Sequence, residues 1–95
     1  MSYNIPNSNG SLFRENVNNA LTDISERISL GVSFNIPNSD FNTFIVNINE
    51  ALKELASMLP CKEVPCISND KDNLRTNIND ALNKLEMSIP KKFRR

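Results

Sequence analysis

The sequence Asn-Ile-Asn-Glu-Ala-Leu at residues 47–52 decides the fold, because close variants of it occur twice more in the chain. Asn-Val-Asn-Asn-Ala-Leu occupies residues 16–21, and Asn-Ile-Asn-Asp-Ala-Leu occupies residues 77–82. The longer segments around these sequences align without a gap, and they are residues 2–29, 33–60 and 63–90. A period of about 30 residues predicts three similar units that bury their apolar faces against one another.

Each copy carries one apolar stripe with the spacing of an α-helix. Apolar residues recur at i, i+4, i+7, i+8, i+11 and i+15, which lie on one face of a helix with about 3.6 residues per turn. The three stripes are Phe13, Val17, Ala20, Leu21, Ile24 and Ile28; Phe44, Ile48, Ala51, Leu52, Leu55 and Leu59; and Leu74, Ile78, Ala81, Leu82, Leu85 and Ile89. The pattern predicts three amphipathic helices of about 17–19 residues each.

Capping and helix-breaking residues mark the limits of these helices. The predicted N-caps are Asn9, Asp40 and Asp70, with the preceding Ser8, Ser39 and Asn69 as alternatives. Pro60 and Pro90 are expected to end the second and third helices, because proline cannot continue a helix. Gly31 is expected to end the first.

A short alternating segment precedes each helix. In each segment we expect two apolar side chains to point to one side at period two, and these pairs are Tyr3 and Ile5, Phe34 and Ile36, and Val64 and Cys66. The pattern predicts extended segments that lie on the helices, with a short sheet as a further option.

The length of the connections bears on the topology. About ten to twelve non-helical residues separate successive helices, whereas about two to eight are usual between antiparallel neighbours. Ten extended residues reach about 33 Å, which is long enough to run back along a helix. The sequence therefore favours three parallel helices around a pseudo-threefold axis, and an antiparallel bundle remains the alternative.

Two asparagine columns recur beside the stripe. They are Asn16, Asn47 and Asn77, and Asn18, Asn49 and Asn79. Asparagine is a poor helix former, because its amide competes for backbone hydrogen bonds. We expect these amides to bond the backbone of the neighbouring extended segments. A ladder of amides that binds a carbohydrate or a protein partner is the alternative.

Composition excludes several classes of function. The 95 residues have a net charge of zero and contain no His and only two Gly, so no histidine chemistry and no glycine-rich phosphate loop is expected. The carboxylates are scattered over predicted solvent-facing positions. We therefore predict a protein that is not an enzyme and that uses no cofactor or metal.

We expect the chain to be made in a cytoplasm, because no secretory signal is visible in the sequence. We expect no association with membranes, because the sequence has no apolar run long enough to span a bilayer. Cys61 and Cys66 match neither a redox motif nor a zinc site. Reduced thiols are the expected state, and a local disulfide is the alternative.

The third helix resembles a known structural element. Residues 74–85, Leu-Arg-Thr-Asn-Ile-Asn-Asp-Ala-Leu-Asn-Lys-Leu, are similar to a short helical element of tailed-phage fibre and other virion proteins. In that element, Arg-x-x-Ile/Leu-Asn-x-Ala-Leu-x-x-Leu builds a parallel trimer of helices. Residues 13–21 match it again, and the second copy departs from it with Ile45 in place of Arg14 and Arg75. The resemblance implies a virion component built for assembly.

The second copy and the C-terminal tail supply the candidate contacts. The second copy has extra apolar residues off the shared stripe, and the tail holds four of the 11 basic residues, so the rest of the chain is mildly acidic. The candidate partner-binding residues are Phe41, Ile45, Val46, Met58, Lys91, Lys92, Phe93, Arg94 and Arg95. The extra apolar residues mark the second helix either as the most buried or as the face that meets a partner.

The sequence thus predicts a mainly α single domain over residues 1–95, a three-helix bundle of tandem repeats with short extended segments between the helices. The predicted function is a non-enzymatic structural or assembly protein of a phage or virus particle, assembled in the host cytoplasm. It would pack against fibre, collar or tail components, and a homo-oligomer is left open. The alternative is a small phage-encoded regulator that binds a host protein. Nucleic-acid binding is a third and weaker hypothesis than these two, because the domain without its tail is mildly acidic.

Overall fold

The fold consists of three helices that pack side by side. The computed structural model describes residues 3–6, 10–60 and 64–90. The helices are α1 (Gly10–Arg27), α2 (Phe41–Ala56) and α3 (Leu74–Met87), and the described residues form no β-strand. The predicted three-helix bundle is therefore confirmed. The predicted length of 17–19 residues holds for α1, with 18, and is too long for α2 and α3, with 16 and 14.

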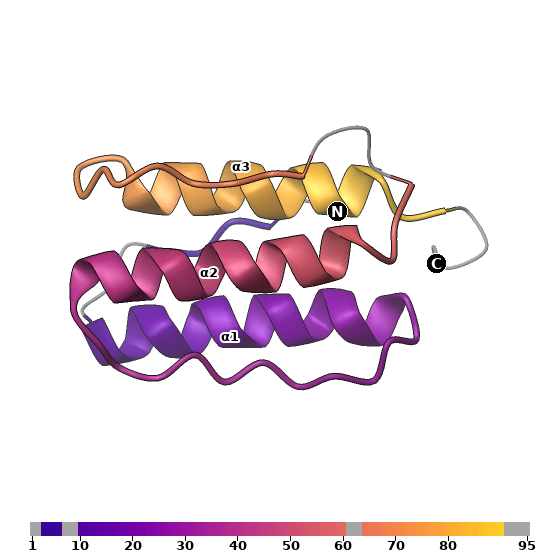
Figure 1. Cartoon of the computed structure of the whole chain (residues 1–95), viewed down its shortest axis with the longest axis horizontal. Coiled ribbons are helices and arrows are strands. Elements are labelled where there is room, and N and C mark those ends of the chain that lie inside the picture. Colours follow the sequence, from indigo (N-terminus) through magenta and orange to yellow (C-terminus); the bar gives the residue numbers. More distant parts are fainter. Residues whose placement is uncertain (1–2, 7–9, 61–63, 91–95) are drawn as a thin grey trace.

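The three helices are parallel. In Figure 1 each one starts at the left of the view and ends at the right, and an extended segment returns from the end of α1 to the start of α2, and from the end of α2 to the start of α3. The molecule is accordingly elongated along the helices, with extents of 37 × 22 × 21 Å. The antiparallel alternative is excluded by this arrangement.

The predicted apolar stripes form the core. Val17, Leu21 and Ile24 of α1 are completely buried, and the equivalent residues of α2 and α3 are at most 1% exposed. Only Phe13 and Leu74, at the helix starts, are partly exposed. Each fully buried Leu or Ile contributes about 2 kcal/mol of transfer free energy, so the stripe is the main source of stability.

The helix ends agree with the sequence only in part. Asp40 caps α2, and its carboxylate accepts a hydrogen bond from the Thr43 N–H at 3.3 Å. Asn9 and Ser8 lie outside the described residues. The expectation for Gly31 was wrong, because Ser29 already takes the left-handed conformation that ends α1, with φ 58°. The Leu30 N–H then donates to the Ser25 carbonyl across this turn, in a Schellman motif.

The prediction that Asp70 caps α3 was also wrong. α3 begins four residues later, at Leu74, and Asp70 instead builds the turn before it. The carboxylate of Asp70 accepts hydrogen bonds from the Asp72 N–H at 3.2 Å and from the Asn73 side chain at 2.8 Å.

The third extended segment is shifted by one residue relative to the prediction. Val64 and Cys66, which were expected to face the helices, are exposed, and Pro65 and Ile67 are buried instead. Cys66 is a free thiol, and Cys61 lies outside the described residues. The gapless alignment failed here because the third copy has one residue fewer between its extended segment and its helix. In a segment of period two, one residue reverses the buried face.

An asparagine at the same position of each helix holds one extended segment. The Asn18 amide oxygen accepts a hydrogen bond from the Ile36 N–H at 2.7 Å, and its nitrogen donates to the Ile36 carbonyl at 3.2 Å. The side chain thus satisfies both backbone groups of a buried residue, as a neighbouring β-strand would. We call this two-bond contact an amide clamp.

The same clamp recurs on the other two helices. Asn49 of α2 bonds the Ile67 N–H and carbonyl at 2.8 and 3.1 Å. Asn79 of α3 bonds the Ile5 N–H and carbonyl at 2.7 and 3.3 Å. Because Ile5 comes from the start of the chain, this third clamp closes the ring of helices and segments. The predicted role of this asparagine column is confirmed.

Further side chains secure two of the three segments. Thr22 of α1 accepts a hydrogen bond from the Phe34 N–H at 2.9 Å. In α3 the equivalent residue, Asn83, bonds both the N–H and the carbonyl of Tyr3. In α2 this position is Lys53, and the facing residue is Pro65, which has no N–H to offer.

The clamp makes a direct prediction for stability. Replacing Asn49 by Ala leaves the Ile67 N–H and carbonyl without partners, and we expect a loss of about 2 kcal/mol in the free energy of unfolding. Asn47→Ala on the same helix is the matched control. It removes no clamp and exchanges a poor helix former for the best one, so its stability should stay within about 0.5 kcal/mol of the unmodified chain. Chemical denaturation measures both, and equal losses would contradict the assignment.

Candidate partner-binding surface

The predicted contact residues of α2 do not form one patch. Val46 and Met58 are exposed, at 54% and 55%, whereas Phe41 is half-buried and Ile45 is only 6% exposed. Phe41 opens α2 and Met58 lies in the turn after its last residue, so the two are separated by about the length of the helix, roughly 24 Å at 1.5 Å per residue. Val46 and Met58 therefore remain candidate contacts.

The assignment of Ile45 to a partner was wrong, because its side chain belongs to the core. On α1 and α3 the equivalent position contacts the extended segment. In α1 it is Arg14, which donates to the Ile36 carbonyl at 2.9 Å but leaves its buried Nε without a partner among the described residues. In α3 it is Arg75, which donates to the Ile5 carbonyl at 3.4 Å. An isoleucine here avoids an unpaired buried nitrogen.

Phe41 belongs to the end of the bundle at which the helices start. It packs against the core, and the Lys71 ammonium lies 5.3 Å from the centre of its ring, within the range of a cation–π contact. Phe41 borders a hollow of about 250 Å³, whose lining includes Phe13, Phe44 and Leu74 from the first turns of the three helices. The parallel arrangement brings three positive helix-dipole ends to this end of the molecule.

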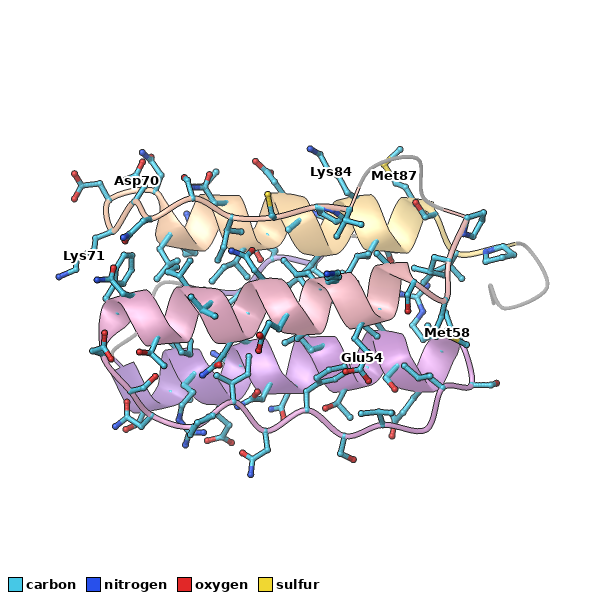
Figure 2. The ribbon with its side chains drawn as sticks, in the orientation of Figure 1. Glu54, Met58, Asp70, Lys71, Lys84 and Met87 are labelled. Carbon is cyan, nitrogen blue, oxygen red and sulfur yellow. The ribbon has the colours of Figure 1, made fainter. Side chains whose placement is uncertain are left out.

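The opposite end carries exposed apolar side chains. Met58 and Met87 lie toward the end at which the helices finish (Figure 2). Met87 is 76% exposed, and Val64, which opens the third extended segment, is 49% exposed. The chain also continues from α3 at this end, toward the basic tail (Figure 1). The tail residues Lys91, Lys92, Phe93, Arg94 and Arg95 lie outside the described residues.

Two members of the second asparagine column, Asn47 and Asn77, lie in shallow grooves. One groove, of about 240 Å³, runs between residues 34–37 and α2, and its lining includes Asn47, Glu50 and Glu54. An equivalent groove of about 300 Å³ runs between residues 65–68 and α3.

That second groove is lined by the equivalent positions Asn77, Asp80 and Lys84. No clamp involves this column within the described part of the chain, so the prediction that both columns bond the backbone holds for one column only. In the other column, Asn47 and Asn77 line open grooves.

Tyr3 joins the first segment to two helices. Its hydroxyl donates to the Asp23 carboxylate at 2.7 Å. Arg27 donates to the Tyr3 oxygen at 3.1 Å and to the Glu86 carboxylate of α3 at 3.0 Å. Burial and, next, the hydrogen bond to Asp23 raise the pKa of Tyr3 to about 12. The hydrogen bond with Tyr3 is also the largest cause of the raised pKa of Arg27.

Sequence reasoning missed this cluster. The available signal was that Tyr3 carries a hydroxyl where the second copy has Phe34, and that Asn83 stands where the other copies have Thr22 and Lys53.

No group of three or more His, Cys, Asp or Glu side chains among the described residues could hold a metal ion. None of the helices in the described ranges combines the length and the apolar character needed to cross a bilayer.

Comparison of the chain with protein-family models, with curated proteins and with solved structures found no match. The resemblance of residues 74–85 to a phage fibre element therefore stays a prediction.

The Tyr3 cluster predicts a pH dependence. The pKa of Tyr3 lies above its ordinary value of 10 in the folded chain, so the folded state binds this proton more tightly than the unfolded state. Its stabilising contribution should be complete below pH 10 and should be lost as the pH rises from 10 to about 12. Denaturation at a series of pH values measures this.

Tyr3→Phe is the control, because it removes the titrating group and leaves every lysine in place. The variant should lose less stability than the unmodified chain between pH 10 and 12. Identical pH profiles for the two proteins would contradict the role of the hydroxyl.

Proposed function

We propose that this chain is a non-enzymatic assembly protein of a phage or virus particle, which binds fibre, collar or tail components through the surface of its helix bundle. The observation that carries the proposal is the parallel arrangement of three helices in one chain, closed by the clamp between Asn79 and Ile5. Parallel helices around one axis are the architecture of a fibre trimer, and here one chain supplies all three helices.

The symmetry of the two ends supports this proposal. Because the helices are parallel, each end presents three equivalent chain positions around one axis, such as Phe13, Phe44 and Leu74 at the end where the helices start. A partner with threefold symmetry would meet similar surfaces from all three units. An antiparallel bundle would offer no such match.

Differences among the three units give the bundle a preferred orientation on its partner. Met58 occupies the position of Arg27 and Ser88, and Met87 that of Glu26 and Ser57. Methionine is flexible and polarisable, and it is common at protein-binding surfaces. We assign the partner contact to the end that carries Met58 and Met87.

The basic tail is proposed as a second anchor. It follows α3, so it is tethered at the end that carries Met58 and Met87. Four positive charges in residues 91–95 suit an acidic protein surface, and Phe93 suits an apolar depression within it. Exposed charges are screened by salt, so this part of the binding should weaken as ionic strength rises.

Co-sedimentation with purified particles tests the proposal. The unmodified chain should sediment with intact particles at a fixed stoichiometry, and Met58→Glu/Met87→Glu should lower its affinity more than tenfold, because two buried contacts become charges. Leu12→Glu is the matched control, since Leu12 is 50% exposed on α1 near the opposite end. It should bind like the unmodified chain.

Two results would contradict this proposal. The chain would be absent from particles and would instead capture one host protein if it were a regulator. Equal binding of the double Met variant and the unmodified chain would show that the partner does not contact the end that carries Met58 and Met87. Circular dichroism of each variant confirms that the helices are intact.

A further inference from the structure

The extended segment between α1 and α2 has one bonded edge and one free edge. On the side of α1, the Asn18 clamp holds Ile36. The N–H of Phe34 donates to Thr22 on the same side. In an extended chain, the N–H and C=O groups of successive residues point to opposite sides. Those of Asn35 therefore point away from α1, and they have no hydrogen-bond partner in the described part of the chain.

This free edge borders the groove of about 240 Å³ that residues 34–37 form with α2, which we call the α2 groove. From the helix, the groove is lined by the buried Ala51 and the half-buried Asn47. The amide of Asn47 makes no hydrogen bond within the described ranges. An extended chain in the groove would have the backbone of Asn35 on one side and this amide on the other. An asparagine amide beside an extended backbone is also the arrangement that forms the three clamps.

The helix side of the α2 groove is acidic. Glu50 and Glu54 line it one helical turn apart, and both are exposed. Glu54 points from α2 toward the returning segment (Figure 2). Neither carboxylate has a hydrogen-bond or ion-pair partner among the residues that the structure describes. Positive side chains on an occupant would therefore meet two unpaired negative charges.

The first unit shows which kind of group is missing from this groove. Asp23 of α1 occupies the position equivalent to Glu54, and its carboxylate accepts a hydrogen bond from the Tyr3 hydroxyl at 2.7 Å. The second unit has Phe34 in place of Tyr3, and phenylalanine has no donor to offer. The chain itself thus supplies a donor to the carboxylate of the first unit and none to that of the second.

We propose that the α2 groove binds an extended segment of a partner protein that carries basic side chains at alternate positions. This binding mode is strand addition at an exposed backbone edge. The backbone of the segment pairs with Asn35 and with the amide of Asn47, and its basic side chains pair with Glu50 and Glu54. The inference is independent of the assembly role proposed above, because it concerns a different surface and needs no virus particle.

The spacing of the two carboxylates selects the alternate positions. Glu50 and Glu54 are separated by about 6 Å along the helix, at 1.5 Å per residue. Residues i and i+2 of an extended chain lie about 6.6 Å apart and point to the same face. The residue between them points to the opposite face, toward Ala51, where a small apolar side chain fits. The recognised pattern is therefore basic, apolar, basic.

The equivalent groove on α3 provides an internal control. Asp80 and Lys84 line it at the positions of the two glutamates, so a basic segment meets one charge of each sign there. Its free edge is the backbone of Cys66. We expect the same segment to bind more weakly on α3 than on α2.

Peptide titration followed by NMR of the isotope-labelled full chain tests the proposal. The probe is Ser-Arg-Val-Arg-Ser with blocked ends. We expect the N–H of Asn35 and the side-chain amide of Asn47 to shift with a dissociation constant at or below about 1 mM. The signals of Cys66 and Asn77 should shift less. The same peptide methylated at the backbone nitrogens of Arg-Val-Arg keeps its charges but cannot donate, so it should bind at least about tenfold more weakly.

Two double variants test the charges. Glu50→Gln/Glu54→Gln should weaken peptide binding at least about tenfold, because both charge pairs are lost. Glu15→Gln/Glu26→Gln is the matched control, since it removes the same charge from exposed positions of α1 outside the groove. It should bind within about twofold of the unmodified chain. Circular dichroism confirms that both variants keep their helices.

Several results would overturn the proposal. Unchanged Asn35 and Asn47 signals at millimolar peptide would show that the groove binds no such segment. Equal weakening by the two double variants would indicate general attraction to an acidic domain, and equal binding of the methylated peptide would indicate charge without backbone pairing.

Two other occupants would also overturn it, and each has its own signature without added peptide. If the chain's own tail filled the groove, replacing its four basic residues by Ser would shift the Asn35 and Asn47 signals. If a second copy filled it, the same signals would move on dilution.

Discussion

A backbone segment that packs on apolar helices without joining a sheet leaves its own N–H and C=O groups without partners. Each such buried group costs about 1–3 kcal/mol, so an extended return segment cannot lie on a helix unless something bonds it. Here Asn18, Asn49 and Asn79 each bond both backbone groups of one buried isoleucine. The asparagines weaken the helices slightly and make the return segments possible.

The parallel topology depends on this contact. Parallel helices need long connections, and these connections must run the full length of the bundle along its surface (Figure 1). Held by the clamps, the connections bury Ile36 and Ile67 against the core. The first segment makes the same contact on α3 through Ile5, so every helix carries one segment. The fold is therefore a closed ring of three equivalent units, and this geometry supports an assembly role.

The sequence predicted the parts of this arrangement that repeat. The apolar stripes, the parallel direction and one asparagine column could be read from spacing, because burial imposes a period on the residues. The buried face of residues 64–67 could not, since one missing residue between Ile67 and Leu74 changes the register and leaves the helix columns aligned. The exposed Met58 and Met87 follow no period in the sequence. Ile45 lies off the shared apolar stripe, so its place in the core could not be read from the spacing either. No repeating pattern in the sequence indicates the Tyr3 cluster.

Amide hydrogen exchange tests the clamp most directly. The N–H groups of Ile5, Ile36 and Ile67 lie outside helices and strands, yet each is bonded by an asparagine. They should exchange at least about a hundredfold more slowly than the N–H groups of their exposed neighbours Asn4, Asn35 and Cys66, a difference of about 2.7 kcal/mol. Exchange of all six amides at the rate of an open loop would contradict the account.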